Sequence, residues 1–356
     1  MNYPILLLPV IVVVAGLFNL PAASAHENYV LPAADIARGM SDWNVNVFDA
    51  LQNPANLKVA LLVAGASLLV FILYYFLALS KIGLMLDDKL KQLEPLGHVI
   101  LRLALGASFI ASALFHSFLG PEIPLTGLPW GQFWQPSLFA LGGLLILGWF
   151  TEIAAVAGLI LMLAATLIYG DYMLTYFNYF GEFIALLFFG SRFFSLDRFR
   201  AGATNLFQKY QQWEIPIIRI TYGISVLYPA IVIKILHPAI ILQIVNQYHL
   251  NQIHWLFPSD PLLISLGTGL AQIVVGLFII LGFETRLNSA ITFVLYVLSI
   301  AFFREAVWPH YILLALGLYL VTNNGGGWSV DGWLRKKRHW LFGGVARSVF
   351  TAGIRR

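Results

Sequence analysis

The chain of 356 residues is 59% hydrophobic and only 11% charged, which excludes an ordinary soluble domain, where about a quarter of the residues carry charge. It contains no cysteine, so disulfides, thiolate chemistry and cysteine-ligated clusters are excluded. The formal net charge of +4 alone indicates little, because the positions of the charged residues decide what they can bind. Nothing in those positions indicates nucleic-acid binding.

Apolar runs of helical length alternate with short polar loops along most of the chain. In lipid the backbone must satisfy its own hydrogen bonds, so a run of about 20 apolar residues crosses as a helix. The alternating segments of a membrane barrel are not visible. We therefore predict an all-α integral membrane protein.

The N-terminal region has the pattern of a signal segment followed by an exported stretch. An apolar run, Ile5 to Leu20, precedes Pro21-Ala-Ala23-Ser-Ala25, whose small residues are typical of a cleavage site. We predict a signal peptide over residues 1–25, with a retained anchor as the alternative because the start lacks Lys and Arg. Residues 26–56 are then an exported polar segment, and 57–80 form the first mature transmembrane helix.

A unit then occurs twice, at residues 96–199 and 215–333, and we refer to these as copy one and copy two. Three short motifs carry the match: Arg102-x-x-x-Gly106 with Arg219-x-x-x-Gly223, Ile146-Leu-Gly148-x-x-Thr151 with Ile280-Leu-Gly282-x-x-Thr285, and Ser195-x-Asp197 with Ser329-x-Asp331. The first pair is offset by 117 positions and the others by 134, so copy two has gained 17 residues. Such internal similarity predicts a duplicated structural unit.

Each copy contains four apolar stretches of helical length. The predicted helices are 96–119, 136–150, 152–169 and 175–190 in copy one, and 215–236, 261–282, 284–303 and 308–322 in copy two. Four helices cross the membrane an even number of times, so the chain returns to the side from which it started. The two copies therefore have the same orientation in the membrane. The expected fold is two tandem parallel four-helix transmembrane bundles, preceded by the signal segment and one extra transmembrane helix.

The basic residues predict the orientation of the chain. With residues 26–56 exported, 15 of the 21 Lys and Arg residues lie in cytoplasmic loops or in the basic tail, residues 334–356. We therefore expect a multi-pass protein of the inner (cytoplasmic) membrane with a cytoplasmic C-terminus. Its tail could also contact anionic membrane lipid.

The three motifs, in the same order and present twice, resemble the DoxX/DoxD-like family of four-helix membrane proteins, over nearly all of both copies. The DoxD branch is a subunit of thiosulfate:quinone oxidoreductase, so the resemblance implies a quinone, sulfur-compound oxidation and a redox partner protein. The chain departs from the family pattern at Glu152, where copy two keeps the usual Arg as Arg286. It also has His116 where the family often has Lys.

Arg102, Glu182 and His116 are the candidate cofactor-binding residues. At 1.5 Å per residue, Arg102 and Glu182 lie roughly 9 and 12 Å from the cytoplasmic ends of their helices, so an ion pair between them is expected. Leu316 replaces Glu182 in copy two, so this pair forms only once. Either the pair is structural, or these residues bind a quinone head or carry a proton.

Other polar residues have simpler interpretations. Asp197 and Asp331 are expected to cap or brace the chain where it leaves the membrane. Glu152 and Arg286 are expected to face the seam between the copies or nearby loops at the cytoplasmic surface, with solvated loop charges as the alternative.

Six histidines and four tryptophans are expected in the exported half: His26, His116, His237, His249, His254 and His310, with Trp130, Trp134, Trp255 and Trp308. The tryptophans are typical of an interfacial belt, with the wall of a quinone pocket as the alternative. The histidines are expected to be polar loop and interface residues, and a metal site among them remains open.

The leading hypothesis is an integral-membrane subunit of a quinone-linked oxidoreductase system, with a partner protein supplying the primary redox chemistry. No nucleotide or cluster motif is visible in the chain. The alternatives are a non-enzymatic assembly or cargo-binding membrane protein, and a small-solute or metal transporter.

Overall fold

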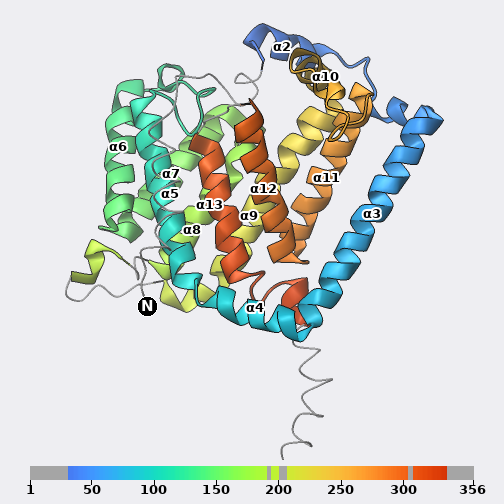
Figure 1. Ribbon diagram of the computed structural model, residues 1–356. Helices are drawn as coiled ribbons and strands as arrows, with labels where there is room; N and C mark the ends of the chain where they lie inside the picture. Colours follow the sequence, from blue (N-terminus) through green and yellow to red (C-terminus); the bar gives the residue numbers. More distant parts are fainter. Residues whose placement is uncertain (1–30, 191–193, 200–206, 304–307, 335–356) are drawn as a thin grey trace, which may run out of the picture.

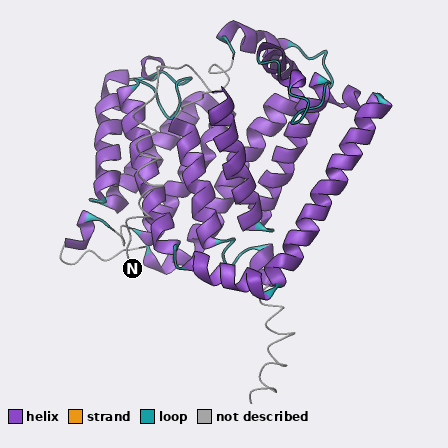
Figure 2. Cartoon of the chain, viewed as in Figure 1, coloured by secondary structure: helices purple, strands orange, loops and turns teal. Residues whose placement is uncertain are grey.

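The computed structural model describes residues 31–190, 194–199, 207–303 and 308–334, and these fold into an assembly of helices (Figures 1 and 2). Among the described residues no β-strand occurs, and the only strand-like feature is an isolated bridge between Ser117 and Pro124. The predicted signal peptide, residues 1–25, and the basic tail from 335 onward lie outside the described residues.

Three α-helices precede copy one in the described part of the chain: α2 (Ala33–Ser41), α3 (Pro54–Leu79) and α4 (Lys81–Lys91). Asn53 caps α3 by accepting a hydrogen bond from the Ala55 amide, and the Ser80 side chain caps α4. The apolar window of α3 is 0% buried by protein, so its surface suits contact with lipid. Helix α4 runs along the lower end of the molecule from α3 to copy one (Figure 1).

Helices occupy each stretch that the sequence predicts for the two copies. Copy one contains α5 (Glu94–Leu114), α6 (Gly131–Leu147), α7 (Thr151–Tyr169) and α8 (Phe177–Phe189). Copy two contains α9 (Glu214–Pro229), α11 (Pro261–Leu281), α12 (Thr285–Phe303) and α13 (Trp308–Asn323). The region that copy two has gained forms a π-helical turn, η6 (Ala230–Leu236), and helix α10 (Pro238–Gln247).

Within the described part of the chain, six helical stretches are long and apolar enough to cross a membrane, judged by length and composition. Helices α7 and α8 count as one of them, because a 3-10 segment (Gly170–Tyr176) joins them into a continuous stretch, Thr151–Phe189. Helices α6 and α13, with 17 and 16 residues, are shorter than any of these stretches. The prediction of a multi-pass all-α membrane protein is confirmed.

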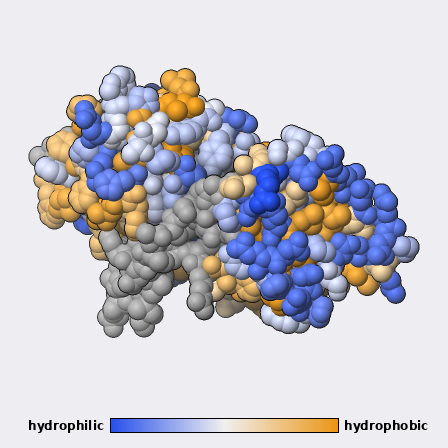
Figure 3. Space-filling view, turned by 90° about the horizontal axis from the view of Figure 1, so that it is seen from above, coloured by the Kyte–Doolittle hydropathy of each residue, from blue (hydrophilic) through white to orange (hydrophobic). Residues whose placement is uncertain are grey.

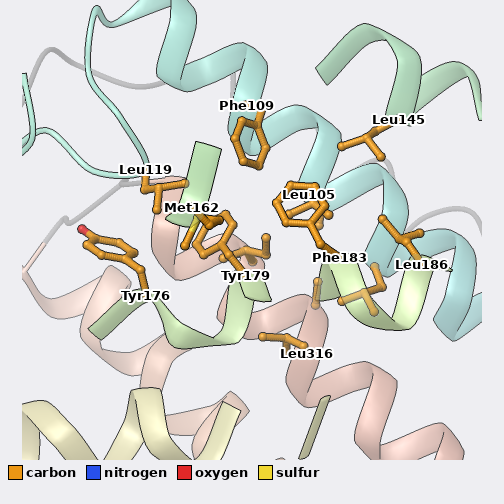
Figure 4. Packing of buried hydrophobic residues seen from close by; sticks show 14 of the residues in the cluster. Leu105, Phe109, Leu119, Leu145, Met162, Tyr176, Tyr179, Phe183, Leu186 and Leu316 are labelled. Carbon is orange, nitrogen blue, oxygen red and sulfur yellow. The ribbon is translucent and has the colours of Figure 1, made fainter. Parts of the chain in front are cut away.

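The helix pairs show how the copies join. Within each copy the first helix packs on the second and the third on the fourth, but the first and fourth make few contacts. Instead, α8 packs on α9 and α13 packs on α5, so each fourth helix lies against the first helix of the other copy. The two expected bundles therefore share one hydrophobic core, to which Leu316 of copy two and Phe183 of copy one both belong (Figure 4).

The described N-terminal segment is attached to the region that copy two has gained. Helix α2 packs on α10, and the Trp43 ring lies edge-on to the His237 ring at 4.2 Å. The Asn56 side chain donates to the Asp260 carboxylate at 2.5 Å. This end of the molecule, seen in Figure 3, presents many hydrophilic residues with hydrophobic ones between and beside them.

Candidate functional site

The three sequence motifs of copy one gather at one end of the bundle, which we call the motif end. Helix α6 terminates at Gly148, whose φ of +60° is the left-handed conformation that glycine adopts without strain. The Asp197 carboxylate accepts hydrogen bonds from the amides of Phe150 (2.9 Å) and Thr151 (3.0 Å), which caps the start of α7. The Asp197 amide in turn donates to the Gly148 carbonyl at 3.0 Å.

Arg102 completes this arrangement, which we call the motif latch. Its guanidinium donates to the Phe194 carbonyl at 2.5 Å, and the side chain is buried. A Cβ atom at Gly148 would overlap the guanidinium, so glycine is needed there for space as well as for its backbone conformation. Arg102 therefore ties α5 to the segment that follows α8.

Copy two builds the same latch with the same contacts. The Asp331 carboxylate accepts from the amides of Glu284 (2.8 Å) and Thr285 (2.9 Å), and Arg219 donates to the Trp328 carbonyl at 2.6 Å. Gly282 has a φ of +67°, and a Cβ there would overlap the Arg219 guanidinium. The expectation that both aspartates cap the chain is confirmed, and the repeated residues have a structural role.

The expected ion pair between Arg102 and Glu182 is wrong. Arg102 is held by the Phe194 carbonyl, near Asp197, whereas Glu182 bonds to Asn178 one turn away on α8. A long Arg side chain can reach the backbone carbonyls at the helix ends, so it does not need a carboxylate at the depth of its own Cα atom. The helical depth of the two Cα atoms therefore did not predict where the charged groups lie.

Glu182 belongs instead to a polar network between the two copies. The Asn178 side chain donates to Glu182 Oε1 at 2.9 Å, and Ser225 of α9 exchanges hydrogen bonds with Asn178. Glu182 is fully buried, and its Oε2 has no hydrogen-bond partner among the described residues. Gly181 allows α9 to approach this closely, because a Cβ there would overlap the Thr221 side chain.

A cavity of about 180 Å³ adjoins this network at the end of the bundle opposite the motif end, and we call it the seam cavity. It lies between α8 of copy one and the helices of copy two. Its lining residues are Thr175, Tyr176, Asn178, Tyr179, Ser225, Pro229, Ile233, Lys234, Ile241, Ile244, Gln272, Tyr296, Pro309, His310 and Leu313. Asn178 thus contacts both the cavity and Glu182, which lies one helical turn deeper.

Three polar side chains of copy two line the seam cavity, namely Lys234, His310 and Gln272. No carboxylate among the described residues forms an ion pair with the partly buried Lys234. His310 is buried, and its ring lies 5.7 Å from that of Tyr296. Gln272 donates to the Val226 carbonyl at 2.9 Å, which leaves its own carbonyl oxygen available as an acceptor.

The structure does not bring His116 to this cavity. His116 follows the end of α5 with a φ of +52°, and its side chain is exposed. His249 and His254 are also exposed, and His237 packs against Trp43. Among the described residues no group of three or more His, Cys, Asp or Glu side chains could hold a metal ion.

A second buried polar cluster joins the copies near the motif end, and it was missed in the sequence. His98 of α5 forms an ion pair with Glu214 of α9 at 2.6 Å, and the Tyr319 hydroxyl of α13 donates to the same carboxylate oxygen at 2.5 Å. The available signal was a carboxylate at the first position of an apolar helix, where copy one has Gly97. Its contacts hold three helices together, which indicates a structural role.

Arg286 lies neither at the seam nor in solvent but, as the expectation of nearby segments allowed, against the linker helix α4 and the end of α13. Its side chain is buried, pairs with Asp87 of α4 and donates to the Val321 carbonyl at 2.8 Å. The turn position after the latch therefore attaches α4 to copy two. Glu152, at the equivalent position in copy one, is partly buried.

Comparisons with protein-family models, curated proteins and solved structures find no significant match to this chain. Membership of the DoxX/DoxD-like family therefore stays a prediction.

Proposed function

We propose that the protein is an integral-membrane subunit of a quinone-linked oxidoreductase system, and that the seam cavity receives the quinone head group. The observation that carries this proposal is the position of the seam cavity one helical turn from Glu182, a fully buried carboxyl group with an unpartnered oxygen. A buried polar group of this kind is costly unless it has a partner or a role.

The size and lining of the seam cavity support a ring-sized ligand. Its volume of about 180 Å³ is below the roughly 300–1,000 Å³ of pockets for drug-sized molecules. Tyr176, Tyr179 and Tyr296 provide aromatic walls, and Ile233 and Leu313 add aliphatic ones. A flat head group suits these walls, while an isoprenoid tail would extend between helices into lipid.

The polar residues support recognition of carbonyl oxygens. The Lys234 ammonium carries three donors and no acceptor, so it matches the oxygen of a quinone. His310 offers a second donor or acceptor on α13, depending on its tautomer. Both belong to copy two, whereas Asn178 and the Tyr179 ring approach from copy one.

A bound quinone supplies two-electron, two-proton redox chemistry. In this proposal Glu182 holds one of the two protons, and Asn178, hydrogen-bonded to it, marks the route toward the cavity. Lys234 and His310 hold the oxygen atoms that gain or lose protons. The electrons come from or go to a redox partner protein, and the resemblance of the motifs implies a sulfur compound as the primary substrate.

The same proposal includes the finer topology. The matching latches of the two copies support a parallel duplication of a DoxX/DoxD-like unit, with nine mature spans. The bias of Lys and Arg supports a cytoplasmic motif end and an exported seam-cavity end in the inner membrane.

The test compares the quinone retained by purified wild-type protein and three variants. Full-length wild type, Lys234→Met, Glu182→Gln and the control Lys58→Met, which alters an exposed lysine of α3, are purified from quinone-containing membranes and extracted. We expect about one quinone per wild-type or Lys58→Met chain. Because a hydrogen bond to a charged group contributes about 1.5–3 kcal/mol, Lys234→Met should weaken quinone binding by roughly 10- to 150-fold.

Two outcomes would contradict the proposal. Equal retention in all four proteins would place any quinone outside the seam cavity. A folded wild-type protein that neither retains nor binds added quinone would favour the assembly or transport alternatives.

A further inference from the structure

A second cavity lies at the motif end, between the elbow that joins α3 to α4 and the latch of copy two, and we call it the elbow cavity. Its volume is about 110 Å³. Apolar residues form one side, including Leu77, Ala78 and Leu86 of the elbow. The other side is strongly polar, with Glu284, Arg286 and Asp331 of copy two, and Asp87 of α4 also lines the cavity.

Glu284 is the unexplained residue of this cavity. It is only 5% exposed, and neither of its carboxylate oxygens has a hydrogen-bond partner among the described residues. It lines the cavity directly. An unpaired carboxylate that is removed from water costs free energy, so it needs a bound partner or it takes up a proton.

The neighbouring side chains are already engaged with one another. The Asp331 carboxylate accepts from two backbone amides and from the Thr285 hydroxyl. Asp87 is paired with Arg286 and, at 3.2 Å, with Lys91. Arg286 also donates to the Val321 and Thr322 carbonyls. None of these contacts supplies a cation to Glu284.

Copy one shows that the latch itself does not require a carboxylate at this position. Phe150 is the equivalent residue, with a φ of +50° against +45° for Glu284, and its amide bonds to Asp197 just as the Glu284 amide bonds to Asp331. Phe150 and Glu284 therefore serve the turn equally well. The carboxylate belongs to the feature that copy two alone has, which is the elbow cavity.

We propose that the elbow cavity binds an ammonium group, with the Glu284 carboxylate as its charged partner. Three carboxylates against Arg286 make the cavity acidic, so it favours a cation. An ammonium group has three donors and can bond both orphaned oxygens of Glu284. The apolar side of the cavity suits a ligand with a carbon chain.

The ammonium group has two possible sources, a lipid head group and a soluble amine. The surface of α3 is open to lipid along its apolar window, and the elbow follows the end of this helix. A phosphatidylethanolamine molecule beside α3 would therefore carry its amine at the level of the elbow cavity. A soluble amine would instead enter from the aqueous side.

The charge of Glu284 predicts a pH dependence for this binding. Burial, together with the nearby Asp331 carboxylate, raises the pKa of Glu284 to about 7. The other titratable groups that face it are Tyr74 of α3, Asp87 of α4 and Arg286 of α12. Because the ammonium pairs with the ionised carboxylate, its affinity should rise roughly tenfold between pH 6 and pH 8.

The first experiment uses full-length protein in nanodiscs that contain equal amounts of phosphatidylethanolamine and phosphatidylglycerol. Native mass spectrometry counts the lipid molecules that remain bound to wild type, Glu284→Gln, Glu284→Phe and Asp88→Asn. Asp88 is an exposed carboxylate of α4 that does not line the cavity, so Asp88→Asn is the matched control. We expect one retained phosphatidylethanolamine in wild type and Asp88→Asn, and none in either Glu284 variant.

The second experiment identifies a soluble source. Protein in discs that lack phosphatidylethanolamine is titrated with ethanolamine, and its thermal midpoint is followed at pH 6 and pH 8. A rise that is larger at pH 8, and absent in Glu284→Gln, supports the site with a free amine as ligand.

Both experiments have outcomes that would contradict the ammonium site without bearing on the quinone proposal. Lipid retention or a thermal shift that is equal in wild type and Glu284→Gln would overturn the proposal, as would the absence of both effects in wild type. Glu284→Phe carries the residue that copy one has at this turn, so its folding is expected and its loss of binding is interpretable. Quinone retention in the seam cavity, at the opposite end of the bundle, should be the same in all four proteins.

Discussion

The two copies share the residues that build the latch and differ at their buried carboxylates. Both latches contain an arginine, a glycine with positive φ and a capping aspartate, with nearly identical hydrogen bonds. Each copy also contains a buried carboxylate with an oxygen that has no hydrogen-bond partner among the described residues, Glu182 in copy one and Glu284 in copy two, which the other copy replaces with Leu316 and Phe150. In this duplicated protein, residues that break the repeat are better functional candidates than residues that maintain it.

The largest expected effect is the loss of either latch. Gly282→Val places a branched side chain against the Arg219 guanidinium at a φ of +67°. We expect destabilisation of more than about 4 kcal/mol, because overlap and backbone strain combine. Gly148→Val should have a similar effect in copy one. Size-exclusion profiles and thermal midpoints in detergent measure this.

The matched control is Gly267→Val on α11, where an added Cβ would meet no atom within 4 Å. If Gly267→Val is as damaging as Gly282→Val, the latch has no special importance. If only one copy is sensitive, the equivalence of the two latches is wrong.

The next largest effect is a difference in stability between substitutions of Arg102 and of Glu182. Arg102→Leu removes a buried guanidinium from the Phe194 carbonyl, and we expect a loss of about 2–4 kcal/mol. Glu182→Gln preserves the acceptor for Asn178 and should change stability by less than about 1 kcal/mol.

A double-mutant cycle on these two residues gives the clearest result, since unconnected residues add within about 0.5 kcal/mol. We expect additivity in measured unfolding free energies. A coupling free energy of several kcal/mol would contradict the structure, because it would indicate that Arg102 and Glu182 interact directly.

The capping aspartates should show a smaller and symmetrical effect. Asp197→Ala and Asp331→Ala each remove two amide contacts at the start of a helix, and loss of such a cap costs about 0.5–2 kcal/mol. Thermal midpoints of the two variants should fall by similar amounts, whereas Asp→Asn variants should recover part of the loss. A neutral Asp197→Ala beside a damaging Asp331→Ala would show that the copies are not equivalent here.

The smallest effect is the pH dependence from Glu284. Its pKa is about 7 in the folded state, above the ordinary value of 4.5 expected when unfolded, so the folded state binds more protons between these values. Without an ammonium ligand, wild-type stability should fall as pH rises from about 4.5 to 7 and then level off. Glu284→Gln should lack this component, while Asp88→Asn should retain it. Identical profiles for wild type and Glu284→Gln would show that the carboxylate is not perturbed by burial.

The sequence alone determined the features that are local in the chain. Hydrophobicity and length located the helices of both copies, and spacing located the motifs, because a membrane helix satisfies its own backbone wherever it packs. The role of Asp197 also followed from sequence, since a cap bonds to neighbouring backbone. The region gained by copy two was visible as a difference in spacing, although its packing against α2 was not.

Which residues meet depends on how the helices pack against one another. The pairing of α8 with α9 and of α13 with α5 arises from close contacts such as Gly181 with Thr221, which no periodicity reveals. The partner of Arg102 depended on the reach of a flexible side chain toward helix-end carbonyls rather than on its depth in the helix. The seam and elbow cavities likewise lie between segments that are distant in sequence, so that Glu284 lines one cavity and Glu182 lies one helical turn from the other.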